Sequence, residues 1–153
     1  MQQFVRNLSE IQTPEQLTDW TRNHAVTEEM INEVMVGVRS FLDSGEFQSA
    51  MRLSEWCLQL SENVPAVAVR ARALVTRGIT LARMDQLAES LPFLDAAIAL
   101  YQSSGDELAT AKVWMNRVHC YSTLEDTRRH CATAKTATVY SANWVKNNCS
   151  RGA

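Results

Sequence analysis

The sequence predicts an all-α protein, and three observations support that fold class. Signals for helix starts and ends run through almost the whole chain of 153 residues. Strand signals are missing, because no hairpin dipeptide such as Asn-Gly occurs and no stretch keeps apolar and polar residues alternating for long. Apolar positions also recur at an offset of forty residues. A composition of 46% hydrophobic residues with 5 Gly and 3 Pro excludes a disordered or collagen-like chain.

Capping residues mark the start of each predicted helix. Thr13 precedes Pro14 at the first helical position and opens a short helix to residue 23. Thr27 opens the next, with two acidic residues placed against the helix dipole. The later helices are expected at 46–61, 66–84, 86–104 and 107–124, with a last helix that fades near 141.

Turn residues mark where these helices end. Gly45 and Gly105 end their helices, and the segment from Asn63 to Pro65 breaks the chain. Asp85 is expected to cap the helix that begins at residue 86. The last tight turn is predicted at Glu125-Asp126.

A repeat of forty residues relates the first helices of three successive pairs. The aligned residues lie at i, i+1, i+4 and i+7, which places them on one helical face. They are Val34, Leu74 and Trp114; Met35, Val75 and Met115; Val38, Gly78 and Val118; and Phe41, Leu81 and Tyr121. The unit is therefore predicted to be a helical hairpin used three times.

The second helices follow the same period, and small residues recur in them. The aligned sets are Phe47, Leu87 and Thr127; Ala50, Ser90 and His130; Met51, Leu91 and Cys131; and Cys57, Ala97 and Ala137. Two helices approach to about 8–10 Å only where the side chains at their crossing are short. Gly78, Cys57 and Ala97 are therefore predicted to be buried at helix crossings.

At this point the chain resembles the tetratricopeptide repeat family, in its variants with a period of about forty residues that occur in kinesin light chain and in bacterial signalling proteins. The phrase SLPFLDAAIAL, with its internal proline, is similar to the second helix of that family's unit. The residues that carry the resemblance are Leu74, Gly78, Leu81, Leu87, Ser90, Leu91, Pro92, Leu94, Ala97 and Ile98. The third unit departs from the pattern, because its second helix is rich in Thr and poor in large apolar residues.

The resemblance implies a short α-solenoid of three antiparallel helical hairpins with an N-terminal capping helix. Residues 1–26 would hold the capping helix, 27–62, 66–104 and 106–141 the three hairpins, and 142–153 a C-terminal tail. Leu17 and Trp20 lie on one side of the capping helix and would close one end of the stack.

The resemblance further implies that the first helix of each hairpin lines a concave face that binds peptides or partner helices. Twelve positions then point inward, and they include four cations and no acid. The candidate partner-binding residues are Arg39, Arg72, Val75, Ile79, Arg83, Lys112, Met115 and His119, and the other inward positions are Asn32, Met35, Leu42 and Ser122. Such a lining favours an acidic segment. Long cations that solvate an exposed helix face are an equally good interpretation, so both stay open.

Residue types that carry catalysis are present but not in a catalytic pattern. The pairs His119-Cys120 and His130-Cys131 would supply zinc ligands, but neighbours on a helix point about 100° apart and do not converge on one ion. No signature of a cysteine nucleophile surrounds them, and no glycine-rich phosphate loop occurs. The four cysteines form no CxxC motif and are expected to be free thiols. We therefore expect no enzyme, no metal and no cofactor.

The charge distribution bears on location and partners. The net charge of −2 argues against a dedicated nucleic-acid binder. Residues 1–63 hold four Arg and ten acidic residues, and residues 64–153 hold eleven cations and seven acids, so the halves carry about −6 and +4. This asymmetry is typical of solvated helix faces, but it would also suit an acidic partner or a homo-oligomer formed through terminal repeats.

No apolar run would cross a membrane and no secretory signal is evident, which predicts a cytoplasmic protein without membrane association.

The leading hypothesis is a non-enzymatic interaction module that binds a protein or peptide through its concave face. The alternative is a ligand- or peptide-sensing regulatory domain of a larger bacterial signalling system, in which the bound molecule changes the pitch of the stack.

Overall fold

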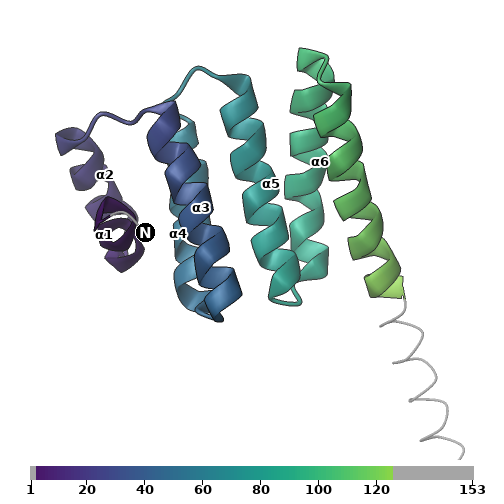
Figure 1. Cartoon of the computed structure of the whole chain (residues 1–153), viewed down its shortest axis with the longest axis horizontal. Helices are drawn as coiled ribbons and strands as arrows, with labels where there is room; N and C mark the ends of the chain where they lie inside the picture. The colour runs from purple at the N-terminus through teal and green to yellow at the C-terminus, as the bar shows by residue number, and fades with distance from the viewer. Residues whose placement is uncertain (1–2, 126–153) are drawn as a thin grey trace, which may run out of the picture. The chain divides into compact units, whose positions relative to one another are not determined.

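A computed structural model of the chain describes residues 3–125, and every regular element in that range is an α-helix (Figure 1). The all-α prediction is confirmed for this part of the chain. The helices are α1 (Gln3–Glu10), α2 (Pro14–Asn23), α3 (Glu28–Ser44), α4 (Phe47–Ser61), α5 (Val67–Arg83) and α6 (Leu87–Ser104). A further helix covers residues 107–125. Residues up to 120 form one compact unit.

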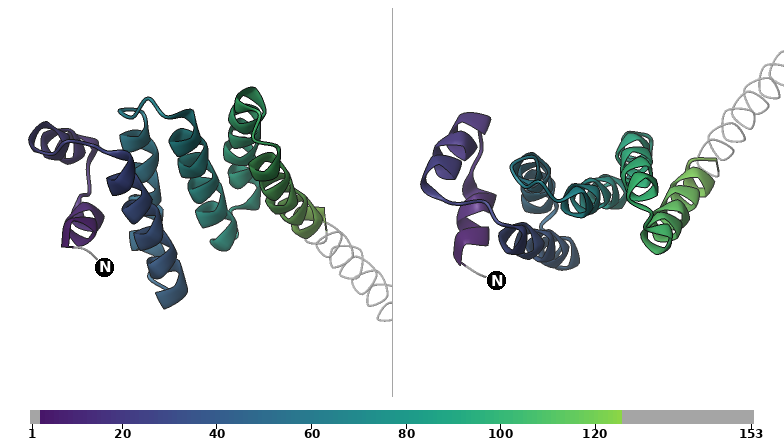
Figure 2. Two further views of the ribbon diagram at one scale, coloured as in Figure 1. Left: turned by 45° about the horizontal axis from the view of Figure 1, so that its top comes forward. Right: turned by 90° about the horizontal axis from the view of Figure 1, so that it is seen from above.

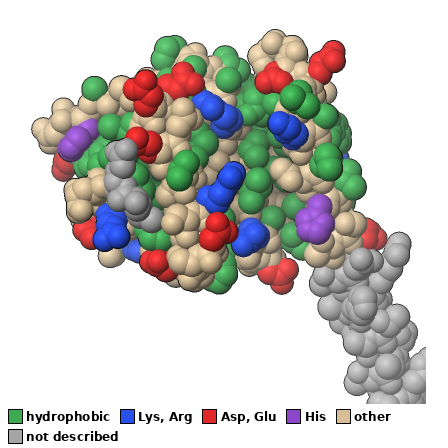
Figure 3. All heavy atoms as spheres, in the orientation of Figure 1, with side chains coloured by type: hydrophobic (Ala, Val, Ile, Leu, Met, Phe, Trp, Pro, Cys, Tyr) green, Lys and Arg blue, Asp and Glu red, His purple; other side chains and the backbone are tan. Residues whose placement is uncertain are grey.

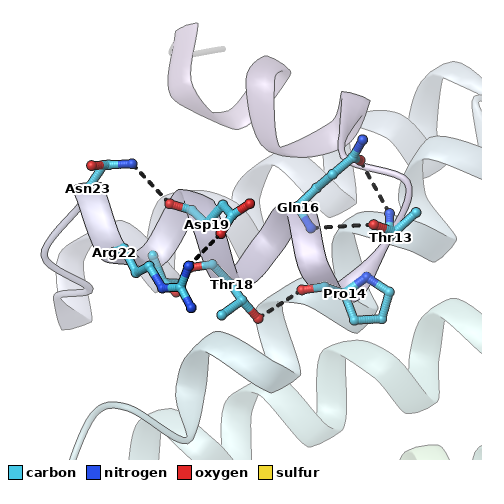
Figure 4. A network of polar contacts seen from close by, with 8 residues as sticks. Thr13, Pro14, Gln16, Thr18, Asp19, Arg22 and Asn23 are labelled. Atoms are coloured by element: carbon cyan, nitrogen blue, oxygen red, sulfur yellow. Dashed lines mark hydrogen bonds and ion pairs between the residues drawn. The ribbon is translucent and has the colours of Figure 1, made fainter.

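The predicted helix starts are confirmed at both threonines. Thr13 accepts a hydrogen bond from the backbone N–H of Gln16 at 3.3 Å, and Gln16 accepts one from the Thr13 N–H, which completes a capping box before Pro14 (Figure 4). Thr27 accepts a hydrogen bond from the Met30 N–H at 3.2 Å. Asp106, after Gly105, accepts one from the Ala109 N–H at 2.9 Å. Local capping chemistry therefore sets these three boundaries.

Helices α3, α5 and α6 each end in the same kind of left-handed turn. The residue with the positive φ is Gly45, Asp85 and Gly105, respectively. Their φ angles are 79°, 63° and 74°. Asp85 does not cap the next helix as the sequence analysis expected. It occupies the position that glycine fills in the other two turns, and α6 begins after Gln86 without a side-chain cap. The backbone geometry of a tight turn between two packed helices dictates this conformation.

The predicted third turn at Glu125-Asp126 is not tested, because Glu125 is helical and Asp126 lies outside the described residues. The second helix of the third predicted hairpin lies outside the described residues, and so does the predicted tail 142–153. The aligned positions Thr127, His130, Cys131 and Ala137 therefore have no structural test here. Trp114 and Val118 were aligned with packed positions of the earlier units, but both are exposed. The helix predicted to cover them lies beyond residue 125.

Helix α1 was not predicted. It has no acid in its first turn and no base in its last, so the usual start and stop signals are missing. Val5 and Leu8 are nevertheless fully buried, because α1 packs against α3 and α4. Gly37 on α3 leaves the room that Val5 fills. The indole N–H of Trp56 on α4 donates to the backbone oxygen of Ile11 at 3.0 Å and fixes the chain after α1.

The later helices pack on one another in chain order (Figure 2). Helix α3 lies against α4, α4 against α5, and α5 against α6. The predicted small positions Cys57, Gly78 and Ala97 are all buried, as are Ala50 and Ser90. Burial of these small positions is therefore confirmed, and at Gly78 the close contact between two helices is observed as well.

One partly buried cation, Arg77, joins α4 to α5. The guanidinium of Arg77 donates to the backbone oxygen of Met51 at 2.8 Å and to the hydroxyl of Ser54 at 3.0 Å. Glu55 lies 3.7 Å away. Burial lowers the pKa of Arg77, while Glu55 acts in the opposite direction. Arg77 therefore has a structural role between the helices and does not line the face that α5 shares with α3.

None of the helices in residues 3–125 combines the length and the apolar content that a membrane span requires.

Candidate functional site

A groove of about 540 Å³ runs between α3, α5 and the helix that starts at residue 107. Six of the eight predicted partner-binding residues line it. They are Arg39, Arg72, Val75, Ile79, Arg83 and Lys112. On the face seen in Figure 3, Lys and Arg side chains lie among hydrophobic ones. The structure thus brings together residues that are up to 73 positions apart in the sequence, from Arg39 to Lys112.

The helical register explains this lining. Arg72, Val75, Thr76, Ile79 and Arg83 are related by i+3, i+4 and i+7 spacings, so α5 presents them on one face. The same register on α3 brings Met35 and Leu42 into the groove. The groove is therefore lined by apolar and cationic side chains together.

Two predicted residues lie outside the groove. Met115 is 73% exposed and His119 is exposed, and neither contributes to the lining. Val113 and Asn116 line the groove in their place. The buried positions of the helix at 107–125 are Val113 and Cys120, forty residues after Ala73 and Thr80, which are also buried.

Two acids neutralise two of the four predicted cations. Glu28 at the start of α3 accepts a hydrogen bond from Arg72 at 3.0 Å. Asp43 near the end of α3 lies 3.9 Å from Arg83. The expectation of a groove with cations and no acid is therefore wrong at both of these positions. The sequence held a signal for these pairs, since each acid precedes its cation by about one repeat and so lies at a similar height on the neighbouring helix.

Arg39 and Lys112 keep their charges uncompensated. Neither forms an ion pair with any residue in the described range. Both line the groove beside apolar side chains. They are the cations available to a partner.

Sequence reasoning missed one groove residue, Tyr101. It comes from α6, the second helix of its pair, and only first helices were expected to line the groove. The residue is 6% exposed. Burial raises the pKa of Tyr101; the nearby Arg72 lowers it and Asp106 raises it further.

Arg72 also has an unsatisfied donor. Its Nε is buried and has no hydrogen-bond partner in the described part of the chain, while the outer end of the guanidinium contacts Glu28. A buried donor without a partner costs free energy, and an added acceptor would recover it.

The thiols in the described range have packing roles. Cys57 is fully buried between helices, and burial raises its pKa to about 12, so it stays protonated at neutral pH. Cys120 is buried with its sulfur 3.5 Å from the hydroxyl of Ser90. Across residues 3–125 no group of three or more His, Cys, Asp or Glu side chains is placed to hold a metal ion. His130, Cys131 and Cys149 lie outside that range.

Comparison of the chain with protein-family models, curated proteins and solved structures finds no match. The groove must therefore be interpreted from its own chemistry.

Proposed function

We propose that this protein is a non-enzymatic interaction module that binds an acidic peptide segment of a partner protein in the groove between α3, α5 and the helix at 107–120. The proposed architecture is a short α-solenoid of the tetratricopeptide type. The order of packing from α3 to α6 and the buried small residues at the forty-residue positions support it.

One observation carries the proposal. Arg39 and Lys112 form no ion pair within the described residues, and they line the groove together with apolar residues such as Val75 and Ile79. A peptide with apolar side chains would bury them against the apolar part of the lining, and its carboxylates would pair with the two cations. The volume of about 540 Å³ accommodates several side chains.

The ion pairs at Arg72 and Arg83 set the design of the test. Reversing either charge would place two acids next to each other and disturb the fold as well as binding. Arg39 and Lys112 carry no such pair, so Arg39→Glu and Lys112→Glu change the groove with little effect on stability.

The experiment is a selection of random peptides displayed on phage, with the full chain immobilised. The expected result is enrichment of peptides that combine Asp or Glu with apolar residues. Arg39→Glu and Lys112→Glu should each abolish capture of those peptides at unchanged helicity. Arg6→Glu on the exposed face of α1 makes the same charge change away from the groove and should leave capture intact.

Enriched peptides without acidic residues would contradict the proposal. So would capture that Arg39→Glu and Lys112→Glu both leave unchanged, because the groove would then not be the binding surface.

A further inference from the structure

The helix that starts at residue 107 exposes an apolar stripe across from its buried positions Val113 and Cys120. This terminal stripe consists of Leu108, Ala111, Trp114, Met115 and Val118, all exposed. The side chains at 108, 115 and 118 are 67%, 73% and 60% exposed. Positions 108, 111, 115 and 118 follow one another at spacings of three, four and three residues. This spacing is the one at which apolar residues form a seam between two paired helices.

The aromatic member of the stripe, Trp114, is held in place from one side. The guanidinium of Arg117 lies over its ring, 4.7 Å from the centroid, and the Nε of Arg117 donates to the carboxylate of Asp95 on α6. A hollow of about 410 Å³, lined in part by Ala111 and Trp114, adjoins the ring. A fixed aromatic side chain loses little conformational freedom on binding, so Trp114 is suited to anchor an interface.

In the two earlier hairpins, the second helix covers the first with large apolar side chains. Helix α4 packs on α3 and α6 packs on α5. The sequence of α4 contains six large apolar residues and that of α6 contains seven. Residues 126–138 contain none, since they are Ala, Thr, Cys, His and charged residues. The chain that follows residue 125 therefore offers little apolar surface for the terminal stripe over these thirteen positions.

We propose that the terminal stripe docks against the same stripe of a second copy of this chain and forms a two-fold symmetric dimer. In such a contact one patch serves on both sides, so each copy supplies the apolar surface that residues 126–138 lack. A net charge of −2 on each chain produces little repulsion between copies. The inference is independent of the proposed function, because no residue of the terminal stripe lines the groove.

Sedimentation velocity of the full chain over a wide range of concentrations tests the dimer. Val118→Glu places a carboxylate from each copy in the apolar contact, and we expect it to raise the dissociation constant of the dimer at least about tenfold. The matched control is Val36→Glu on α3, which makes the same change at a side chain that is 70% exposed and lies outside the terminal stripe. It should leave the dissociation constant unchanged. Circular dichroism checks that both variants keep their helicity.

A photo-crosslink identifies what covers the stripe. Met115→benzoylphenylalanine in the full chain is irradiated in a mixture of isotopically light and heavy chains, and the linked peptides are sequenced by mass spectrometry. We expect links between a light and a heavy chain that join the two copies within residues 107–125. Links within one chain to residues 126–153 would overturn the proposal, because the chain would then cover its own stripe. A wild-type protein that stays monomeric at every concentration would overturn it, and so would a dimer that Val118→Glu leaves intact.

Discussion

A Cβ atom placed on Gly78 would lie 2.8 Å from Cδ2 of Leu94, so α5 and α6 meet at a point where no side chain fits on α5. The carbonyl oxygen of Ser90 would lie 3.3 Å from this added Cβ atom. Tyr101, on the same helix as Leu94 and two turns further along, lines the groove together with residues of α5.

Gly78→Ala should therefore destabilise the protein. Alanine favours a helix by about 1 kcal/mol over glycine, but the added methyl group must displace Leu94, which costs about 1–3 kcal/mol. We expect a net loss of roughly 1 kcal/mol in the free energy of unfolding, measured by urea denaturation. Adding Leu94→Val should remove part of the conflict. A Gly78→Ala variant as stable as wild type would show that α6 is not held at this distance.

Ala97→Leu tests a second small position at the contact of α6. Ala97 is fully buried, so the added atoms have no free space and should cost about 1–3 kcal/mol. The matched control is Ala111→Leu on the exposed face of the following helix, which should change stability by less than about 0.5 kcal/mol. Equal melting curves for the two variants would contradict the packing described here.

Asp85→Gly should stabilise the protein. Asp85 has a φ of 63°, which costs an L-residue free energy that glycine does not pay. We expect a gain of about 0.5–1 kcal/mol, seen as a higher denaturation midpoint. Gly45→Ala at φ 79° should give a loss of similar size. A decrease in stability on Asp85→Gly would mean that the carboxylate makes a contact that outweighs the strain.

Arg77→Ala should be more harmful than the same change at an exposed arginine. Only 14% of the Arg77 side chain is exposed, and the change removes its hydrogen bonds to Met51 and Ser54 together with its packing. We expect a loss of about 2–3 kcal/mol. Arg70→Ala breaks an exposed pair with Glu62 at 3.5 Å and should cost less than about 0.5 kcal/mol. The melting temperature of Arg77→Ala should therefore lie clearly below that of Arg70→Ala.

The ionisation of the Cys57 thiol should make the free energy of unfolding depend on pH in the alkaline range. Burial raises the pKa of this thiol from 9.0 to about 12, so the folded state holds a proton that the unfolded chain releases above pH 9. The stabilisation is complete below pH 9 and is lost as the pH rises toward 12. Urea midpoints measured between pH 8 and pH 11 should fall more steeply for wild type than for Cys57→Ala. Parallel slopes would show that Cys57 ionises in the folded protein as it does in the unfolded chain.

Local signals in the sequence predicted most helix boundaries and the register of the groove. Thr13, Thr27 and Gly45 act through hydrogen bonds and backbone angles within a few residues of themselves, so their effect can be read without the fold. Arg39, Val75 and Ile79 lie in the groove because helical spacing alone decides which residues share a face.

Tertiary packing decided the features that local signals do not encode. Helix α1 has no capping signal, and burial of Val5 and Leu8 against α3 and α4 accompanies its formation. Glu28 pairs with Arg72 across two helices, so the net charge of the groove depended on which acids the packing brought near. Tyr101 lines the groove from α6, the helix that packs closely against α5 at Gly78, and local signals do not encode that packing. Most of the helices and their faces were predictable because the interactions that set them are short-range, whereas the formation of α1 and the choice of which faces meet depend on contacts between residues far apart in the chain.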